Sequence, residues 1–441
     1  MIHSLLIANR GEIACRIIRT AKLLGVRTVV AHSAGDATAL HVREADEAIL
    51  IEGERPVDSY LDPQAIVAAA LASGCDAIHP GYGFLAESSE LAAATQAAGL
   101  VWVGPNEETI VAMSSKVHAR ELMAAAGVPV VPGSTLTEST SDILSAGRDV
   151  GYPLLVKAAA GGGGIGMKQV DDESQLIAAV EQVRAAGSRF FGDSTTFLER
   201  FLTSARHVEV QIFGTKDGRV VDLGERDCSV QRRHQKIVEE SPASRLDQVL
   251  LEGLRAAARL AGKAVDYQNA GTVEFLVAGD AFFFLEMNTR IQVEHPVTEL
   301  VTGIDLIAMQ LESAAGEKVL TEPIERVGHA MEFRVYAEDP VRFLPSPGLL
   351  KTYREPVGDG IRVDSGYSEG DVVTPHFDPL IAKLCVSGAT RDDVLARAEV
   401  ALAEFEIHGT KTNLPFLTAL LQNAEFRAGG YDTGICDRVV R

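Results

Sequence analysis

The chain has 441 residues, of which 46% are hydrophobic and 23% are charged, and its formal net charge is −20. This length can bury a large core and predicts two to three domains, while the acidic balance excludes a general binder of nucleic acid or acidic membranes. No apolar run approaches a membrane span and no signal or transit segment precedes the first predicted strand, so we expect a cytoplasmic protein. Five scattered cysteines lack metal spacing and are expected to be reduced core thiols.

The N-terminal residues alternate between predicted strands and helices. Strands over residues 3–8 and 27–32 flank a helix over residues 11–24, which predicts a parallel βαβ unit. The first turn lacks the G-x-G-x-x-G pattern that brings backbone against a pyrophosphate, so we reject a nicotinamide or flavin cofactor. A later strand, residues 77–85, runs into a glycine-rich turn that contains Tyr82, and a tight strand-to-helix connection explains those glycines equally well.

Four consecutive glycines follow a predicted strand that ends at Lys157. The loop contains Gly161, Gly162, Gly163, Gly164, Ile165 and Gly166. Consecutive glycines lose much conformational entropy on folding, so a loop whose N–H groups close over phosphates explains them better than a flexible linker does. No Gly-Lys-Ser or Gly-Lys-Thr opens a helix here, which excludes a P-loop and leaves a phosphate-covering hairpin with a strand lysine.

Two polar stretches follow in the middle of the chain. Residues 207–213 alternate strictly, so His207, Glu209 and Gln211 share a face that is half-exposed by default. Between Arg226 and Lys236, four basic residues surround His234, and we interpret them as a cationic island that holds anions.

The segment 286–296 follows the apolar run 282–285 and is rich in polar side chains. In a strand, Glu286 and Asn288 share a face, with Arg290 following. If a three-residue loop, 279–281, joins this strand to the strand 272–277, Glu274 lies opposite Glu286. Two carboxylates and an amide oxygen suit Mg²⁺; the alternative is an edge hairpin with solvated acids.

The remaining elements are predicted from periodicity and turn residues. They are a helix over 113–126 that carries Lys116, a polar connector over 133–140, a strand over 197–202, helices over 247–264, 302–316 and 392–406, and a strand over 329–337 that carries Glu332 and Arg334. The glycine-rich segment after this strand is expected to be β structure with many turns.

The segment 286–299, Glu-Met-Asn-Thr-Arg-Ile-Gln-Val-Glu-His-Pro-Val-Thr-Glu, resembles the signature of biotin carboxylase, the ATP-grasp component of biotin-dependent carboxylases. Segments 8–14, 79–85 and 408–413 match the same family, so the resemblance spans essentially the whole chain. It implies an α/β (α+β) architecture with a Rossmann-like βαβ N-terminal domain (1–113), an ATP-grasp domain (114–317) with a mobile lid at about 130–203, and a mixed, β-rich C-terminal domain (318–441).

The resemblance implies that ATP and bicarbonate carboxylate biotin through carboxyphosphate, with ADP and phosphate as products. The implied partners are a biotin carboxyl carrier protein, a carboxyltransferase subunit of an acetyl-CoA or propionyl-CoA type carboxylase of fatty acid biosynthesis, and a second copy in a homodimer. Candidate dimer contacts are Arg16, Arg19 and the turn 377–380. An ATP-grasp ligase that joins a carboxylate to an amine and a non-catalytic nucleotide-binding subunit are the competing hypotheses.

The resemblance also assigns residue roles. The ATP contacts are Lys116, Lys157, Gly161, Gly162, Gly163, Gly164, Gly166, Glu199, Leu202, His207, Gln231 and His234. The bicarbonate contacts are Lys236, Arg290, Gln292, Val293 and Glu294. The ligands of the metal ion (Mg²⁺ or Mn²⁺) are Glu274, Glu286 and Asn288, and the biotin contacts are Arg334 and Tyr82. The expected catalytic residues are Arg290, Glu294 as general base, Lys236, and Arg334, which stabilises the biotin enolate with Arg290. Ile165 departs from the family, which usually has Arg or Lys there.

Overall fold

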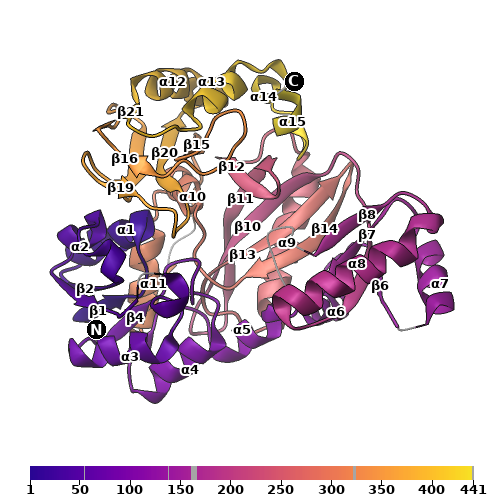
Figure 1. Ribbon diagram of the computed structural model, residues 1–441, viewed down its shortest axis with the longest axis horizontal. Helices are drawn as coiled ribbons and strands as arrows, with labels where there is room; N and C mark the ends of the chain where they lie inside the picture. Colours follow the sequence, from indigo (N-terminus) through magenta and orange to yellow (C-terminus); the bar gives the residue numbers. More distant parts are fainter. Residues whose placement is uncertain (54, 138, 160–165, 321–323, 440–441) are drawn as a thin grey trace.

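The computed structural model describes residues 1–53, 55–137, 139–159, 166–320 and 324–439. In Figure 1 the N-terminal elements lie at the lower left, the C-terminal elements lie above them, and a small sheet with β6, β7 and β8 lies at the far right. Within the described ranges, every helix falls short of the length and apolarity that a membrane crossing requires.

The N-terminal elements form a parallel sheet, as the βαβ pattern predicts. Its strand order is β3-β2-β1-β4-β5, with β1 (Ser4–Ile7), β2 (Arg27–His32), β3 (Glu47–Leu50), β4 (Ala77–His79) and β5 (Val101–Trp102). The helices are α1 (Gly11–Leu23), α2 (Leu40–Glu44), α3 (Pro63–Ala72) and α4 (Ser89–Ala97), with short 3₁₀ turns at Ala34–Asp36 and Pro56–Asp58. All four residues of β1 are buried, as expected for a parallel strand with both faces covered.

The small sheet, here called the lid sheet, has the order β6-β9-β7-β8. Its elements are β6 (Gly133–Thr135), α7 (Thr140–Val150), β7 (Leu154–Ala158), β8 (Met167–Val170), α8 (Glu173–Phe191) and β9 (Thr196–Arg200). The hairpin of β7 and β8 confirms the predicted pairing across the glycine loop. Residues 133–135 pair with β9, so the expectation of a purely polar connector is wrong there.

The largest sheet, here called the central sheet, has eight strands in the order β14-β13-β10-β11-β12-β15-β20-β18. Its strands are β10 (Arg206–Gly214), β11 (Val220–Arg232), β12 (Gln235–Ser241), β13 (Asn269–Ala278), β14 (Ala281–Asn288), β15 (His329–Tyr336), β18 (Ile361–Ser365) and β20 (Leu380–Gly388). Helix α9 (Gln248–Ala264) packs on β10 and β11, burying Leu254, Ala258 and Ala261 at helical spacing. The sheet runs without interruption from the predicted ATP-grasp domain into the predicted C-terminal domain.

Smaller elements complete the C-terminal part. They are β16 (Gly348–Leu349), β17 (Thr352–Arg354), β19 (Val372–Val373), α12 (Arg391–Glu404), β21 (Glu406–His408), α13 (Leu414–Gln422), α14 (Ala424–Ala428) and α15 (Ile435–Val439). Strand β16 pairs with β19, and β17 pairs with β21. This confirms short β structure with many turns, followed by the predicted helix near residues 392–406.

The predicted helix over residues 113–126 is interrupted at Ser115. This residue leaves the helical conformation and its hydroxyl accepts from the backbone of His118, so α5 (Glu107–Ser114) ends and α6 (Lys116–Ala125) begins there. The predicted helix over residues 302–316 corresponds to α11 (Leu306–Ala314), whereas α10 (His295–Thr302), which is followed by Gly303 in the left-handed conformation, was not predicted. Lys116 therefore begins a helix, and α10 begins directly after Glu294.

Candidate functional site

Lys236 of β12 is the centre of the site. Its ammonium Nζ is 2.6 Å from Glu209 Oε2, 2.8 Å from Glu274 Oε1 and 2.7 Å from Glu294 Oε1. The lysine side chain is only 12% exposed, and the three acids are buried. Burial lowers the pKa of Lys236, but the carboxylates outweigh burial and raise that pKa well above its usual value. The ammonium therefore stays charged at any working pH.

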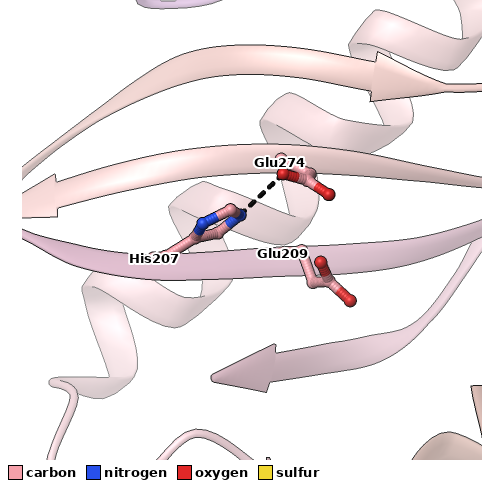
Figure 2. A group of neighbouring side chains, drawn as sticks. All are labelled: His207, Glu209 and Glu274. Carbon is pink, nitrogen blue, oxygen red and sulfur yellow. Dashed lines mark ion pairs between the residues drawn. The ribbon is translucent and has the colours of Figure 1, made fainter. Parts of the chain in front are cut away.

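Neighbouring strands β10 and β13 supply two of these acids. Glu209 and Glu274 are cross-strand partners, and His207 shares the face of Glu209. Figure 2 shows His207 and Glu274 pointing toward one another, with Nε2 2.7 Å from Oε2. Burial lowers the pKa of His207, but the nearby carboxylate of Glu274 outweighs it and the pKa is raised. The expected half-exposed face is wrong: its residues are buried because α10 packs over the adjoining strands β11 and β12.

In the structure, most charges of the predicted cationic island are paired with acids. Arg226 is fully buried, with Nε 2.5 Å from Glu209 Oε1. Arg232 binds Glu338 through two nitrogens at 2.7 Å each. Lys236 is enclosed by its three acids. The sequence shows these cations in one stretch, but their partners come from positions 17 and 106 residues away, which local patterning cannot reveal.

Glu294 lies between two cations at the start of α10. Its Oε1 faces Lys236, and its Oε2 accepts from Arg334 Nη2 at 2.9 Å. The thiol of Cys228 lies 4.0 Å from Oε1. Burial raises the pKa of Glu294, but Lys236 and Arg334 lower it more, so the pKa lies well below its usual value. The side chain is therefore an ionised carboxylate at neutral pH, the protonation state that a proton acceptor needs.

The segment between β14 and α10 presents two further predicted residues to this cluster. Arg290 donates from Nη2 to Asn288 Oδ1 at 2.9 Å and from Nε to Glu87 Oε2 at 3.2 Å. Gln292 donates from Nε2 to Glu274 Oε1 at 2.7 Å. Arg290 is thus held between the N-terminal part and the central sheet, and Gln292 is anchored to an acid that also binds Lys236.

The predicted metal ligands lie at the edge of the central sheet. Glu274 and Glu286 are register partners, as expected, although the loop is the two-residue Gly279-Asp280 and a bulge before Phe275 restores the pairing. Glu286 is 38% exposed and 3.2 Å from Lys116 Nζ, while Asn288 Nδ2 donates to Glu274 Oε1 at 2.8 Å. Two carboxylates and an amide of this kind fit Mg²⁺ or Mn²⁺ by their hard oxygens.

A second group of ligating atoms is a poorer metal site. Atoms of His207, Glu209 and Glu274 lie within 4.8 Å of one another. The ammonium of Lys236 already binds both of these acids, so a metal ion there would meet a fixed positive charge. In the predicted set only Glu274 binds Lys236, whereas Glu286 pairs with the partly exposed Lys116.

The predicted nucleotide residues lie on the lid sheet and on the β11–β12 hairpin. Lys157 forms an ion pair with Glu199, which also accepts from Arg120 at 3.1 Å. Burial lowers the pKa of His234, and the charge of Lys157 lowers it further. His234, on the exposed turn between β11 and β12, therefore lies close enough to Lys157 of β7 to interact with its charge. Gln231 Nε2 is 2.5 Å from His207 Nδ1. The end of β7 and the β11–β12 hairpin thus face the same region.

The rest of the predicted nucleotide set is less defined. Leu202 is half-buried just after β9, and Gly166 has φ +78, a conformation that favours glycine. Gly161, Gly162, Gly163, Gly164 and Ile165 lie outside the described residues.

The two predicted biotin residues come from opposite ends of the chain. Arg334 of β15 binds Glu239 Oε1 at 2.5 Å in addition to Glu294; burial lowers the pKa of its guanidinium, but these acids outweigh burial and leave that pKa raised. Tyr82, in the N-terminal glycine turn, donates its hydroxyl to Glu12 of α1. Each side chain is therefore held by an acid on the scaffold.

Sequence reasoning missed several residues of this cluster. Glu209 shares the alternating stretch with His207, so a signal was present, but the face was interpreted as half-exposed. Arg226 was predicted only as part of the cationic island and Glu239 gave no signal, because a charged residue inside a strand is expected to be exposed unless its distant partner is known. The candidate dimer contact Arg16 is instead buried within the chain, where it binds Glu299 at 2.8 Å.

Two cavities lie elsewhere. One of about 690 Å³ is lined by Lys216, Lys263 and Tyr267 among others, and one of about 350 Å³ by Glu225 and Arg255 among others. None of the predicted site residues that the structure describes lines either cavity.

Comparison with known families covers nearly all of the chain. Residues 1–110 match the biotin carboxylase N-terminal domain, residues 115–322 match the carbamoyl-phosphate synthase L chain ATP binding domain, and residues 332–438 match the biotin carboxylase C-terminal domain. A relative named biotin carboxylase, from Halalkalibacterium halodurans, is 50% identical over 434 residues, which cover 97% of this chain and 96% of the relative.

Solved structures agree with these matches. The biotin carboxylase–beta-gamma-ATP complex from Campylobacter jejuni has a TM-score of 0.97 at 42% identity and covers 99% of each chain. The biotin carboxylase domain dimer of Hydrogenobacter thermophilus 2-oxoglutarate carboxylase, in complex with MgADP, ADP and bicarbonate, has a TM-score of 0.96 at 41% identity, over 100% of this chain and 99% of that one. The Rossmann-like start, the ATP-grasp core and the β-rich C-terminal part, with the cluster around Lys236 inside them, place this chain in the biotin carboxylase family.

Proposed function

We propose that this chain uses ATP and bicarbonate to carboxylate biotin on a separate carrier protein, through carboxyphosphate. The observation that carries the proposal is the placement of Glu294 between Lys236 and Arg334, with Arg290 and Gln292 on the same segment. An anion bound by these cations would lie beside a carboxylate that can take its proton.

In the first step, Lys236 and Arg290 bind bicarbonate with Gln292 and the backbone of Val293. Glu294 removes the proton, and the bicarbonate oxygen attacks the γ-phosphorus of ATP, so that a C–O–P bond forms as the bond to ADP breaks. Lys116, Lys157 and His207 hold the phosphates, with the glycine loop above them. Glu274, Glu286 and Asn288 would hold Mg²⁺, which neutralises phosphate charge when bound.

In the second step, the ureido nitrogen of biotin attacks the carboxyl carbon of carboxyphosphate, so that an N–C bond forms as the C–O bond to phosphate breaks and the released phosphate takes the N–H proton. The ureido oxygen gains negative charge when biotin loses its N–H proton, and we assign Arg334 and Arg290 to stabilise it. Tyr82 lies on the biotin side. Carboxyphosphate hydrolyses in water, so closure of the lid sheet over the site protects it.

The partners follow from the family. We propose a biotin carboxyl carrier protein as the donor of biotin, a carboxyltransferase subunit that takes the carboxyl group onward, and a homodimer. We favour an acyl-CoA as the final acceptor. The division into domains 1–113, 114–317 and 318–441 also stays a proposal.

The decisive experiment measures ATP cleavage with and without bicarbonate, and then with added free biotin. We expect cleavage to require bicarbonate and to rise with biotin. Cleavage that needs an amine instead would overturn the proposal in favour of a carboxylate–amine ligase. Assays with separate acyl-CoA and 2-oxo acid acceptors in the reconstituted complex then test the acceptor.

A variant separates the two steps. Arg334→Gln should keep bicarbonate-dependent ATP cleavage in the absence of biotin and lose biotin carboxylation by roughly a hundredfold or more. Arg232→Gln is the matched control, because Arg232 is an equally paired arginine of the same sheet that binds Glu338 only. Equal loss of both activities in Arg334→Gln, with normal thermal stability, would contradict the division of labour.

A further inference from the structure

A fully buried lysine that none of the assigned roles includes lies beneath the site. Lys383 is on β20, and its side chain is 0% exposed. Its Nζ donates to the backbone carbonyl of Val293 at 2.8 Å and is 3.0 Å from Glu12 Oε2. Asp364 lies 4.0 Å away on the neighbouring strand β18. The three groups around this ammonium belong to three distant parts of the sequence.

Burial of an ammonium is costly unless every proton has a partner. Burial lowers the pKa of Lys383, but Glu12, Glu332 and Asp364 outweigh it and leave that pKa raised. The lysine is therefore charged inside the protein. Asp364 is already bound by Arg362 at 2.6 Å, so the contacts that depend on Lys383 itself are those to Val293 and Glu12.

Each of these contacts leads to one side of the proposed reaction. Val293 lies between Gln292, which is anchored to Glu274, and the base Glu294. Glu12 accepts a hydrogen bond from the hydroxyl of Tyr82. A chain of direct contacts thus runs from the Tyr82 turn through Glu12 and Lys383 to the bicarbonate segment.

We infer that Lys383 is a positioning residue that fixes the Tyr82 turn and the Val293 carbonyl at a set separation, so that biotin meets the carboxyl donor in reacting geometry. This inference rests on the proposed function. Substrate placement within about 1 Å can change a rate by roughly a hundredfold, which is large enough to detect.

The test uses a charge-neutral pair of substitutions, Lys383→Met with Glu12→Gln. Replacing the lysine alone would leave a buried carboxylate without its cation. We expect biotin stimulation of ATP cleavage to fall by roughly ten- to a hundredfold, while the KM for ATP changes by less than about twofold. If Lys383 had a purely structural role, the double variant would have a lower melting temperature and less active protein, but biotin would stimulate its ATP cleavage by the same factor as in the wild-type protein.

Two further variants keep the test decisive. Arg16→Met removes another buried cation that contacts α10 from the same helix α1, and Arg362 remains bound to Glu299 in its place. We expect this control to lose stability and to keep biotin stimulation. Glu12→Gln alone, which is the milder change, should reduce stimulation about threefold, because it weakens only the Tyr82 side.

Unchanged stimulation in the double variant, or in Glu12→Gln if the double variant does not fold, would overturn the inference. So would an equal loss of stimulation in Arg16→Met. If the wild-type protein shows no bicarbonate-dependent ATP cleavage, the proposed function itself is wrong, and this result is independent of every variant.

Discussion

At the scale of single residues, the proposed reaction requires Glu294 to accept a proton although two cations hold it ionised. Lys236 and Arg334 lower its pKa, which makes it a weak base before substrate arrives. Bicarbonate bound to Lys236 would take over hydrogen bonds that the ammonium now gives to Glu294. The pKa of Glu294 would then rise when the bicarbonate proton lies beside it. The ion pairs around Lys236 would therefore keep Glu294 a weak base until bicarbonate is bound.

Glu294→Gln keeps the size of this side chain and removes its capacity to take a proton. We expect bicarbonate-dependent ATP cleavage to fall by roughly 10²- to 10⁴-fold, with or without biotin. Steady-state phosphate release measures it. Glu225→Gln is the matched control, because Glu225 is also buried but pairs with Arg255 away from the cluster. Cleavage at the wild-type rate in Glu294→Gln would assign the base to another group.

At the scale of elements, the β12–β15 pair brings two buried acids face to face. Glu239 and Glu332 are register partners, and both are 0% exposed. Burial raises the pKa of Glu239 to about 7. The positive charge of Arg334 lowers this pKa, but the nearby negative charge of Glu294 opposes that effect. Glu332 has a raised pKa as well, chiefly through burial. Protonation of either acid removes the repulsion that two ionised carboxylates on neighbouring strands would suffer.

This pairing makes stability dependent on pH. A folded-state pKa above the unfolded value means that the stabilising contribution of Glu239 is complete below about pH 4.5 and is lost as pH rises through 7. Glu239→Gln stays neutral, so its melting temperature relative to wild type should increase between about pH 5.5 and 8.5, by an equivalent of up to about 3 kcal/mol. Thermal unfolding across this range measures it.

Glu240, the residue after Glu239, provides a control because its pKa is shifted in the opposite direction. The pKa of Glu240 is lowered to about 2, because His329 and Arg391 outweigh burial. Its contribution is present above the unfolded pKa and is lost only as pH falls toward 2. Glu240→Gln should therefore be less stable than wild type, with no trend over the same pH range. A flat difference for Glu239→Gln would contradict a protonated Glu239.

The lid sheet carries a further prediction. Ile165 lies outside the described residues, but Lys157 on the same hairpin is already paired with Glu199, which leaves this lysine partly neutralised. A family cation at position 165 is absent, so one charge-assisted hydrogen bond of about 1.5–3 kcal/mol is missing. Ile165→Arg should lower the KM for ATP by roughly ten- to a hundredfold, or raise kcat, with little effect on the KM for bicarbonate. An unchanged ATP dependence would show that other groups compensate for Ile165.

Local patterning predicts the elements far better than it predicts their partners. The pairing of Glu274 with Glu286 follows from strand alternation, and it holds although the loop is one residue shorter than expected, because a bulge compensates. Helix α10 was not predicted, although Gly303 directly after it is a typical helix-ending residue. Burial of Arg226 could not be predicted, since it depends on side chains from four other segments.

At the scale of the whole molecule, the proposed reaction takes its biotin from another protein. Biotin is attached in the family to a lysine within Ala-Met-Lys-Met, and the one Met-Lys of this sequence is Met167-Lys168, on β8 of the lid sheet. We predict that the purified chain carries no covalent biotin, and intact mass and a streptavidin blot measure it. A carrier protein that is known to be biotinylated is the positive control. A mass increase that matches one biotin would contradict the prediction.

The unbroken central sheet has a consequence for how the chain folds. The family regions meet between residues 322 and 332, yet β15 hydrogen-bonds to β12 across that junction. A fragment that stops before β15 would leave β12 as an open edge, with Lys236 on it and without Arg334 beside Glu294. The classification boundary is therefore no folding boundary, and the central sheet should melt as one cooperative unit, whereas the lid sheet, with its own small core, can open separately. Divided genes or truncated chains that separate these regions should yield aggregation-prone products in place of partly active enzymes.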